Sequence, residues 1–207
     1  MVLNIVDKFE DNFVETCFEV MNDIHKDMDI VQNDDGTINE QNYMISFAYL
    51  LGVKLGKIDY KVGGELKKEI IIDDEKVKEL VEKLRNTRID ENLTEVNIKP
   101  DFVIHRFLSR DEMNDENQRL IIETKTTRQL NQDHFNWDLY KLSAYINQLA
   151  YKVGIYIIVN ENKNHIDRFL DGYTRCKLPE ITIPYNRKLY FLIQGKDKSN
   201  PEAYLFT

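Results

Sequence analysis

Cysteine is scarce in this sequence of 207 residues, which contains two. Cys17 and Cys176 lie far apart in the chain, so neither a tight zinc knuckle nor a framework of disulfides is indicated. Two cysteines also exclude an iron–sulfur cluster held by four thiolates. We expect both to be inert thiols.

Long hydrophobic runs are absent as well. No apolar stretch approaches the roughly 20 residues needed to span a bilayer. The acidic residues Asp7, Glu10 and Asp11 near the start do not match the charge pattern of a signal peptide. We therefore expect a cytoplasmic protein with no membrane partner, and its 42% hydrophobic content predicts a single domain over residues 1–207.

Positive charge is in deficit. Lysine and arginine total 28 against 36 aspartates and glutamates, which gives a net charge of −8. This balance argues against a general polyanion binder, because such proteins cluster lysine and arginine. It does not exclude a nuclease, since a divalent-cation site is built from carboxylates and the bound ion supplies positive charge.

Hydrophobic residues recur at helical spacing in four segments. Asn39 is suited to cap one of them, and Gly56 and Gly154 are suited to end two. The expected helices cover Asp7 to Lys26, Asn39 to Leu55, a segment around Val77 to Leu84, and Trp137 to Val153.

Apolar and β-branched runs predict the strands. A strand that begins near Val96 and reaches Phe107 should be interrupted or bent at Pro100, because proline cannot donate to a ladder. This strand and the next should form a hairpin. The other expected strands cover Glu69 to Ile72, Leu120 to Thr126, Ile155 to Val159 and Tyr190 to Ile193.

The chemistry is concentrated in this hairpin. Side chains at positions i and i+2 of a strand point to the same face, so Glu123 and Lys125 should emerge together. Pairing with the preceding strand can bring Asp101 beside them. Two carboxylates select Mg²⁺ or Mn²⁺, and such an ion promotes phosphodiester hydrolysis by neutralising the phosphoryl oxygens and generating hydroxide.

Pro100 with Asp101, followed by Glu123, Thr124 and Lys125, resembles the signature of the PD-(D/E)xK nuclease superfamily. The resemblance spans residues 39–160. It implies an α/β, restriction-endonuclease-like core with a central mixed β-sheet flanked by helices, plus an extra N-terminal helix and C-terminal β decorations. It also implies that Asp101, Glu123 and the Thr124 backbone carbonyl bind the metal ion and that Lys125 is the catalytic lysine.

Two further matches concern helices. In RecB-like nucleases the helix after the lysine carries a Gln-x-x-x-Tyr motif, and here Lys141 replaces the glutamine while Tyr145 is kept. Both implied catalytic residues lie with Asp138 and Gln148 on the polar face of that helix. The segment that begins at Asn39 resembles the first nuclease helix of type I restriction subunits, which makes Glu40 a candidate metal ligand, with Glu79 and Glu82 as rivals.

Each of these features has an ordinary alternative. The same tripeptide spacing occurs elsewhere in the chain, for example Glu161 with Lys163, so the context carries the signal. Lys141 and Tyr145 could lie on a solvated helix face, and Glu40 could serve the helix dipole. We expect a Mg²⁺- or Mn²⁺-dependent nuclease that acts on single-stranded or duplex DNA, with a homodimer as one possible assembly. The alternatives are a non-catalytic nucleic-acid-binding or assembly module and a protein-interaction domain.

Overall fold

The computed structural model describes residues 1–27, 31–33, 37–56, 61–64, 68–85, 95–105, 117–126, 130–195 and 200–207. The elements in chain order are β1 (Leu3–Ile5), α1 (Asn12–Lys26), α2 (Glu40–Leu55), β2 (Lys61–Gly64), β3 (Lys68–Ile71), α3 (Glu75–Arg85), β4 (Glu95–Ile98), β5 (Phe102–His105), β6 (Gln118–Thr126), α4 (Gln132–Gln148), β7 (Val153–Val159), α5 (Lys163–Arg175), β8 (Lys188–Gln194) and β9 (Glu202–Phe206).

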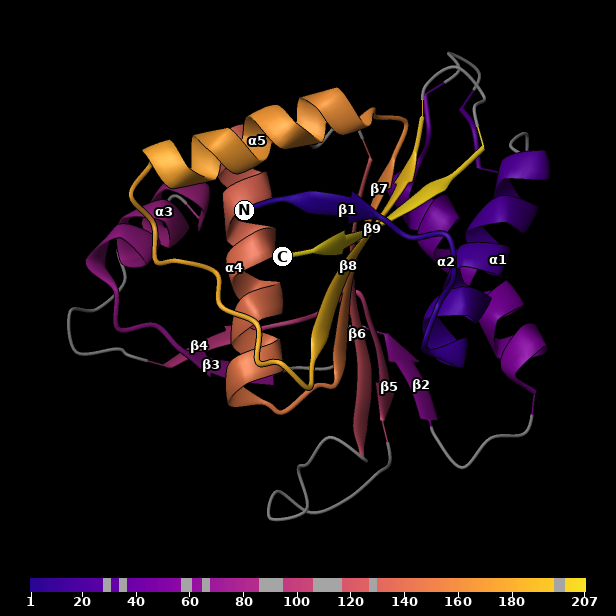
Figure 1. Ribbon diagram of the computed structural model, residues 1–207, viewed down its shortest axis with the longest axis horizontal. Helices are drawn as coiled ribbons and strands as arrows, with labels where there is room; N and C mark the ends of the chain where they lie inside the picture. Colours follow the sequence, from indigo (N-terminus) through magenta and orange to yellow (C-terminus); the bar gives the residue numbers. More distant parts are fainter. Residues whose placement is uncertain are drawn as a thin grey trace.

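A mixed sheet of seven strands organises the chain, in the order β1-β9-β8-β7-β6-β5-β2. Strands β6, β7 and β8 run parallel, whereas β2, β5 and β6 form an antiparallel meander. Helices α1 and α2 cover one face, and α4 and α5 lie on the other (Figure 1). The expected α/β class, with a mixed sheet flanked by helices, is confirmed.

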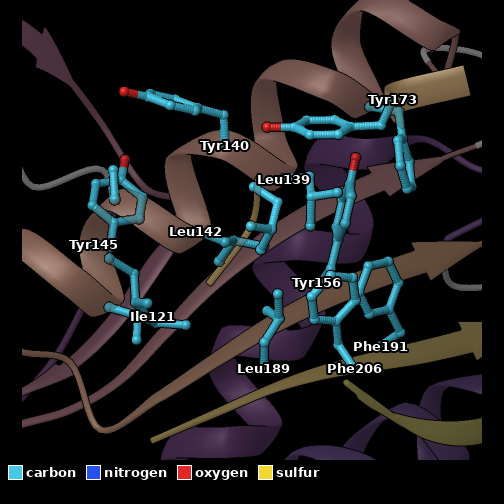
Figure 2. Close-up of a cluster of buried hydrophobic side chains, with 14 of the residues drawn as sticks. Ile121, Leu139, Tyr140, Leu142, Tyr145, Tyr156, Tyr173, Leu189, Phe191 and Phe206 are labelled. Atoms are coloured by element: carbon cyan, nitrogen blue, oxygen red, sulfur yellow. The ribbon is translucent and has the colours of Figure 1, made fainter. Parts of the chain in front are cut away.

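Each face of the sheet has its own hydrophobic core. Figure 2 shows the cluster beneath α4, where Leu139 and Leu142 lie near Ile121 of β6 and the aromatic rings of Tyr156 and Phe191. The neighbouring strand positions, among them those of residues 120 and 122, face α1 and α2 instead. This alternation follows from the two-residue period of a strand and fixes which β6 side chains meet α4.

The second helix begins and ends as expected. The Asn39 side chain accepts a hydrogen bond from the Asn42 backbone N–H at 3.1 Å, and Gly56 follows the last turn with a φ of 60°. The first helix begins later than predicted, because Asp11 caps it by accepting a hydrogen bond from Phe13 N at 2.9 Å.

The boundaries predicted for the long helix are wrong at both ends. Helix α4 begins after Asn131, whose side chain accepts from His134 N, and it ends at Gln148. Gly154 lies inside β7, where a Cβ atom would come within 2.8 Å of Ile146 Cδ1. That glycine therefore allows close packing of the helix on the strand and does not end the helix.

Pro100 separates two strands that belong to different sheets. β4 pairs with β3 in a two-stranded sheet, whereas β5 joins the main sheet between β2 and β6. The hairpin of β5 with β6 is confirmed. The predicted continuation of β5 to Phe107 lies outside the described residues.

Four elements were not predicted: β1, β2, β9 and α5. The signal for α5 was visible, since Ile166, Phe169, Leu170 and Tyr173 recur at helical spacing and are buried. In the described ranges, no helix has the length and apolar character needed to cross a membrane.

Candidate active site

The β5–β6 hairpin places the first carboxylate. Phe102 opposes Ile122 in the antiparallel ladder, so the preceding Asp101 lies opposite Glu123. The Asp101 carboxylate is held there, because its Oδ2 accepts a hydrogen bond of 2.6 Å from the Thr124 backbone N–H. Local pairing thus brings two acidic residues to one end of the hairpin.

Strand β6 presents Glu123 and Lys125 to helix α4. Glu123 Oε2 lies 2.7 Å from Lys141 Nζ, and Lys125 Nζ lies 3.9 Å from Asp138 Oδ2. The residue between them, Thr124, has a buried hydroxyl that makes no hydrogen bond to a described residue. Because Glu123 and Lys125 are two positions apart on β6, both side chains reach α4, as expected.

Helix α4 contributes a buried ion pair to this site. Lys141 Nζ lies 2.9 Å from Asp138 Oδ1 on the preceding turn, and the Tyr156 hydroxyl of β7 donates to Asp138 Oδ2 at 3.1 Å. Lys141 is 7% exposed and Asp138 2%. The solvated-face alternative for Lys141 is therefore wrong, because its ammonium is buried against Glu123 of β6.

Tyr145 lies one turn further along α4 and is also buried (Figure 2). Its hydroxyl makes no hydrogen bond with any described residue. Burial, followed by the charges of Glu123, Asp138 and Asp101, raises the pKa of Tyr145 far above its usual range. The hydroxyl is therefore a neutral donor near the carboxylates, and the solvated alternative fails here too.

Glu40 joins the site from the other side of the sheet, at the first residue of α2. Its Oε1 lies 3.4 Å from Lys125 Nζ, and its Oε2 accepts a hydrogen bond of 3.1 Å from the Thr126 backbone N–H. Both oxygens thus already contact protein donors. Their contacts connect the start of α2 to the end of β6 and hold the Lys125 ammonium in place.

Burial dominates the electrostatics of the two carboxylates on the hairpin. Burial raises the pKa of Asp101 to about 6, although Lys125, the Thr124 amide and Lys141 act in the opposite direction. Burial likewise raises the pKa of Glu123 to about 8, and the nearby Asp101 adds to that rise while Lys141 opposes it. Both carboxyl groups therefore hold their protons more tightly than they would in water, because their ionised forms are poorly solvated.

At Lys125 the neighbouring charges outweigh burial. Burial alone would lower the pKa of its ammonium, but the carboxylates of Asp138, Glu40, Asp101 and Glu123 together raise it above the usual value. Lys125 is therefore a charged ammonium at neutral pH. Such a group can attract a phosphate oxygen and cannot readily accept a proton.

The donor atoms suit a small divalent ion. In the described part of the chain, no group of three histidine, cysteine, aspartate or glutamate side chains is arranged to hold a metal. Mg²⁺, however, commonly takes one or two carboxylates and completes its shell with water and substrate phosphate. Glu123 Oε1 is buried and has no hydrogen-bond partner among the described residues. Asp101 and Glu123 therefore fit an ion that two carboxylates hold.

The structure brings together Asp101, Glu123, Lys125, Lys141 and Glu40, with Tyr145 close to their carboxylates. Glu79 lies apart, 64% exposed on α3 in a surface pair with Lys76, and Glu82 is half-buried on the same helix.

Sequence reasoning assigned no role to Asp138 or Tyr156. The spacing of three between Asp138 and Lys141 was a usable signal for an ion pair within one helix. Tyr156 lies in an apolar strand, and nothing in the sequence indicates that its hydroxyl binds a carboxylate.

No protein-family model matches the chain, and no match was found among curated proteins or among solved structures.

Proposed function

We propose that this chain is a Mg²⁺- or Mn²⁺-dependent nuclease with a restriction-endonuclease-like core, and that it hydrolyses phosphodiester bonds of DNA. The observation that carries the proposal is the contact network at the end of the β5–β6 hairpin. There, two carboxylates, that of Asp101 partly buried and that of Glu123 buried, lie close to two ammonium groups.

The arrangement of elements supports the proposed core. Helix α2 precedes the meander of β2, β5 and β6, and α4 then leads to β7, which runs parallel to β6. The core of the nuclease superfamily that the sequence resembles has this order: a helix, a three-stranded meander, a helix and a further strand. Here β3, α3 and β4 are inserted between the first two strands of the meander.

The residues divide the chemical work as follows. Asp101 and Glu123, with the Thr124 carbonyl as the implied third donor, would hold the ion. When bound, a divalent ion supplies Lewis acidity at the phosphoryl oxygen and a more acidic water. Lys125, held by Glu40 and Asp138, provides a fixed positive charge for the phosphate, where charge develops in the transition state.

A cleavage assay tests the proposal. The purified chain would be incubated with Mg²⁺ or Mn²⁺ and single-stranded, duplex, flap and junction DNA. We expect cleavage by wild type and loss of at least 100-fold in rate for Asp101→Asn and Lys125→Ala, consistent with the removal of a charge-stabilising group. The partly exposed pair of α5, Lys163 with Asp167, lies outside this network and provides the control Lys163→Ala. A wild type that leaves every substrate intact, or an Asp101→Asn variant that cuts normally, refutes the nuclease.

The products also report on assembly. The described residues of a chain form one such site, so a monomer would nick duplex DNA or cut single strands, and a homodimer would cut both strands. Nicked and linear forms of a circular duplex are separated by gel electrophoresis.

The alternative is a non-catalytic nucleic-acid-binding module with the same core. The Lys141–Glu123 contact of 2.7 Å favours it, because an internal cation already neutralises a proposed metal ligand. Oligonucleotide binding in the presence of chelator, with no heat of Mn²⁺ binding in calorimetry, would select this alternative.

A further inference from the structure

The charged groups of the site do not cancel. Its described members are four carboxylates, on Asp101, Glu123, Asp138 and Glu40, and two ammonium groups, on Lys125 and Lys141. When all are ionised the cluster carries a net charge of −2. One divalent ion neutralises this charge, whereas a second ion would leave the buried cluster positive.

The number of unoccupied carboxylate oxygens among the described residues also indicates a single divalent ion. Glu40 contacts Lys125 and the Thr126 amide with its two oxygens, and the two oxygens of Asp138 accept from Lys141 and Tyr156. Glu123 gives one oxygen to Lys141, and Asp101 gives one to the Thr124 amide. Among the described residues this leaves one oxygen on Asp101 and one on Glu123, enough to grip a single ion.

We infer that Lys141 is a built-in cation that takes the place of a second metal ion, so that the chain binds one divalent ion, between Asp101 and Glu123. The inference rests on the proposed function. It also accounts for lysine at the position where the resembled motif has glutamine. A neutral amide there would leave Glu123 and Asp138 without their shared counter-charge.

Position makes this lysine an effective counter-ion. Its ammonium lies 2.7 Å from Glu123 and 2.9 Å from Asp138, and it is buried, so water screens neither contact. A second divalent ion near Glu123 Oε2 would have to displace this ammonium or tolerate its repulsion. Removing the lysine should therefore strengthen cation binding, because it frees an oxygen and removes a positive charge.

Titration calorimetry with MnCl₂ on the full chain measures the number of bound ions and so tests the inference. We expect one Mn²⁺ per wild-type chain and at least tenfold tighter Mn²⁺ binding by Lys141→Gln. The control Lys163→Gln removes a partly exposed lysine that also pairs with an acid on its own helix, and it should bind as wild type does. Two ions on the wild type, or binding by Lys141→Gln that is no tighter than wild type, overturns the inference.

Thermal unfolding provides the second readout, because Lys141→Gln leaves buried carboxylates unpaired and should be less stable without metal. We expect Mn²⁺ to raise the Tm of Lys141→Gln by more than it raises that of wild type or Lys163→Gln. Equal shifts overturn the inference.

The outcomes separate this inference from the proposed function. A wild type that binds no Mn²⁺ refutes both. One bound ion with no cleavage of any DNA substrate refutes the proposed nuclease activity and agrees with one ion per chain. Cleavage with two bound ions refutes only the inference of one ion per chain.

Discussion

Replacing Asp101 with asparagine should stabilise the protein while it abolishes the proposed nuclease activity. Burial is the largest cause of the raised pKa of Asp101, and the opposing attraction of Lys125 and Lys141 does not offset it. The ionised carboxylate is therefore unfavourable in the folded protein without metal. Asparagine has nearly the same shape, and its side-chain oxygen can still accept the hydrogen bond from Thr124 N.

The magnitude and its pH dependence follow from linkage. A folded-state pKa of about 6, above the ordinary 3.8, means that the folded protein holds this proton more tightly than the unfolded chain. Through this group, wild type therefore loses stability as the pH rises from about 4 to about 6. Above that window the loss is complete and amounts to about 3 kcal/mol, which is the largest gain expected for Asp101→Asn.

Urea unfolding in EDTA measures this gain. The excess stability of Asp101→Asn over wild type should rise from about 1 kcal/mol at pH 4.5 to about 3 kcal/mol at pH 7.5. Lys163→Ala serves as the surface control and should show no such trend. An Asp101→Asn protein no more stable than wild type at pH 7.5 would refute the view that burial dominates at this carboxylate. The same gain would show that lost cleavage in this variant is not due to unfolding.

Three further predictions concern packing and pH. Gly154→Ala should lower the free energy of unfolding by about 1 kcal/mol, because the added methyl would lie 2.8 Å from a buried side chain of α4. Gly52→Ala, in the last turn of α2 with open space around the new methyl, should raise it by about the same amount. If both substitutions change the free energy of urea unfolding in the same direction, this contrast is refuted. Tyr43→Phe should not reduce stability, since the lost hydroxyl is buried and has no hydrogen-bond partner among the described residues, and a clear drop in Tm would contradict this. Mn²⁺ affinity should increase from pH 6 to pH 8, because Asp101 and Glu123, with pKa values of about 6 and about 8, must lose their protons to bind the ion; a flat calorimetric profile would contradict this.

Local sequence signals placed the two carboxylates of the hairpin. The strand period brought Glu123 and Lys125 to one face, and antiparallel pairing brought Asp101 opposite Glu123. The start of α2 followed from its Asn39 cap, which also fixed where Glu40 begins the helix. These features depend on neighbours close in sequence or on one hairpin, so residue type and spacing sufficed.

Tertiary packing decided the rest. Whether Lys141 and Asp138 face water or a buried acid depends on how α4 packs on β6 and β7, which supply their partners. Periodicity alone gave the wrong limits for α4, because the packing of Gly154 against it is a contact between separate elements. The sequence by itself thus determined which acids and amines could meet on one hairpin. Only the folded molecule decided which of them are buried, which are already paired, and how much charge remains for an ion, because desolvation depends on everything packed around a group.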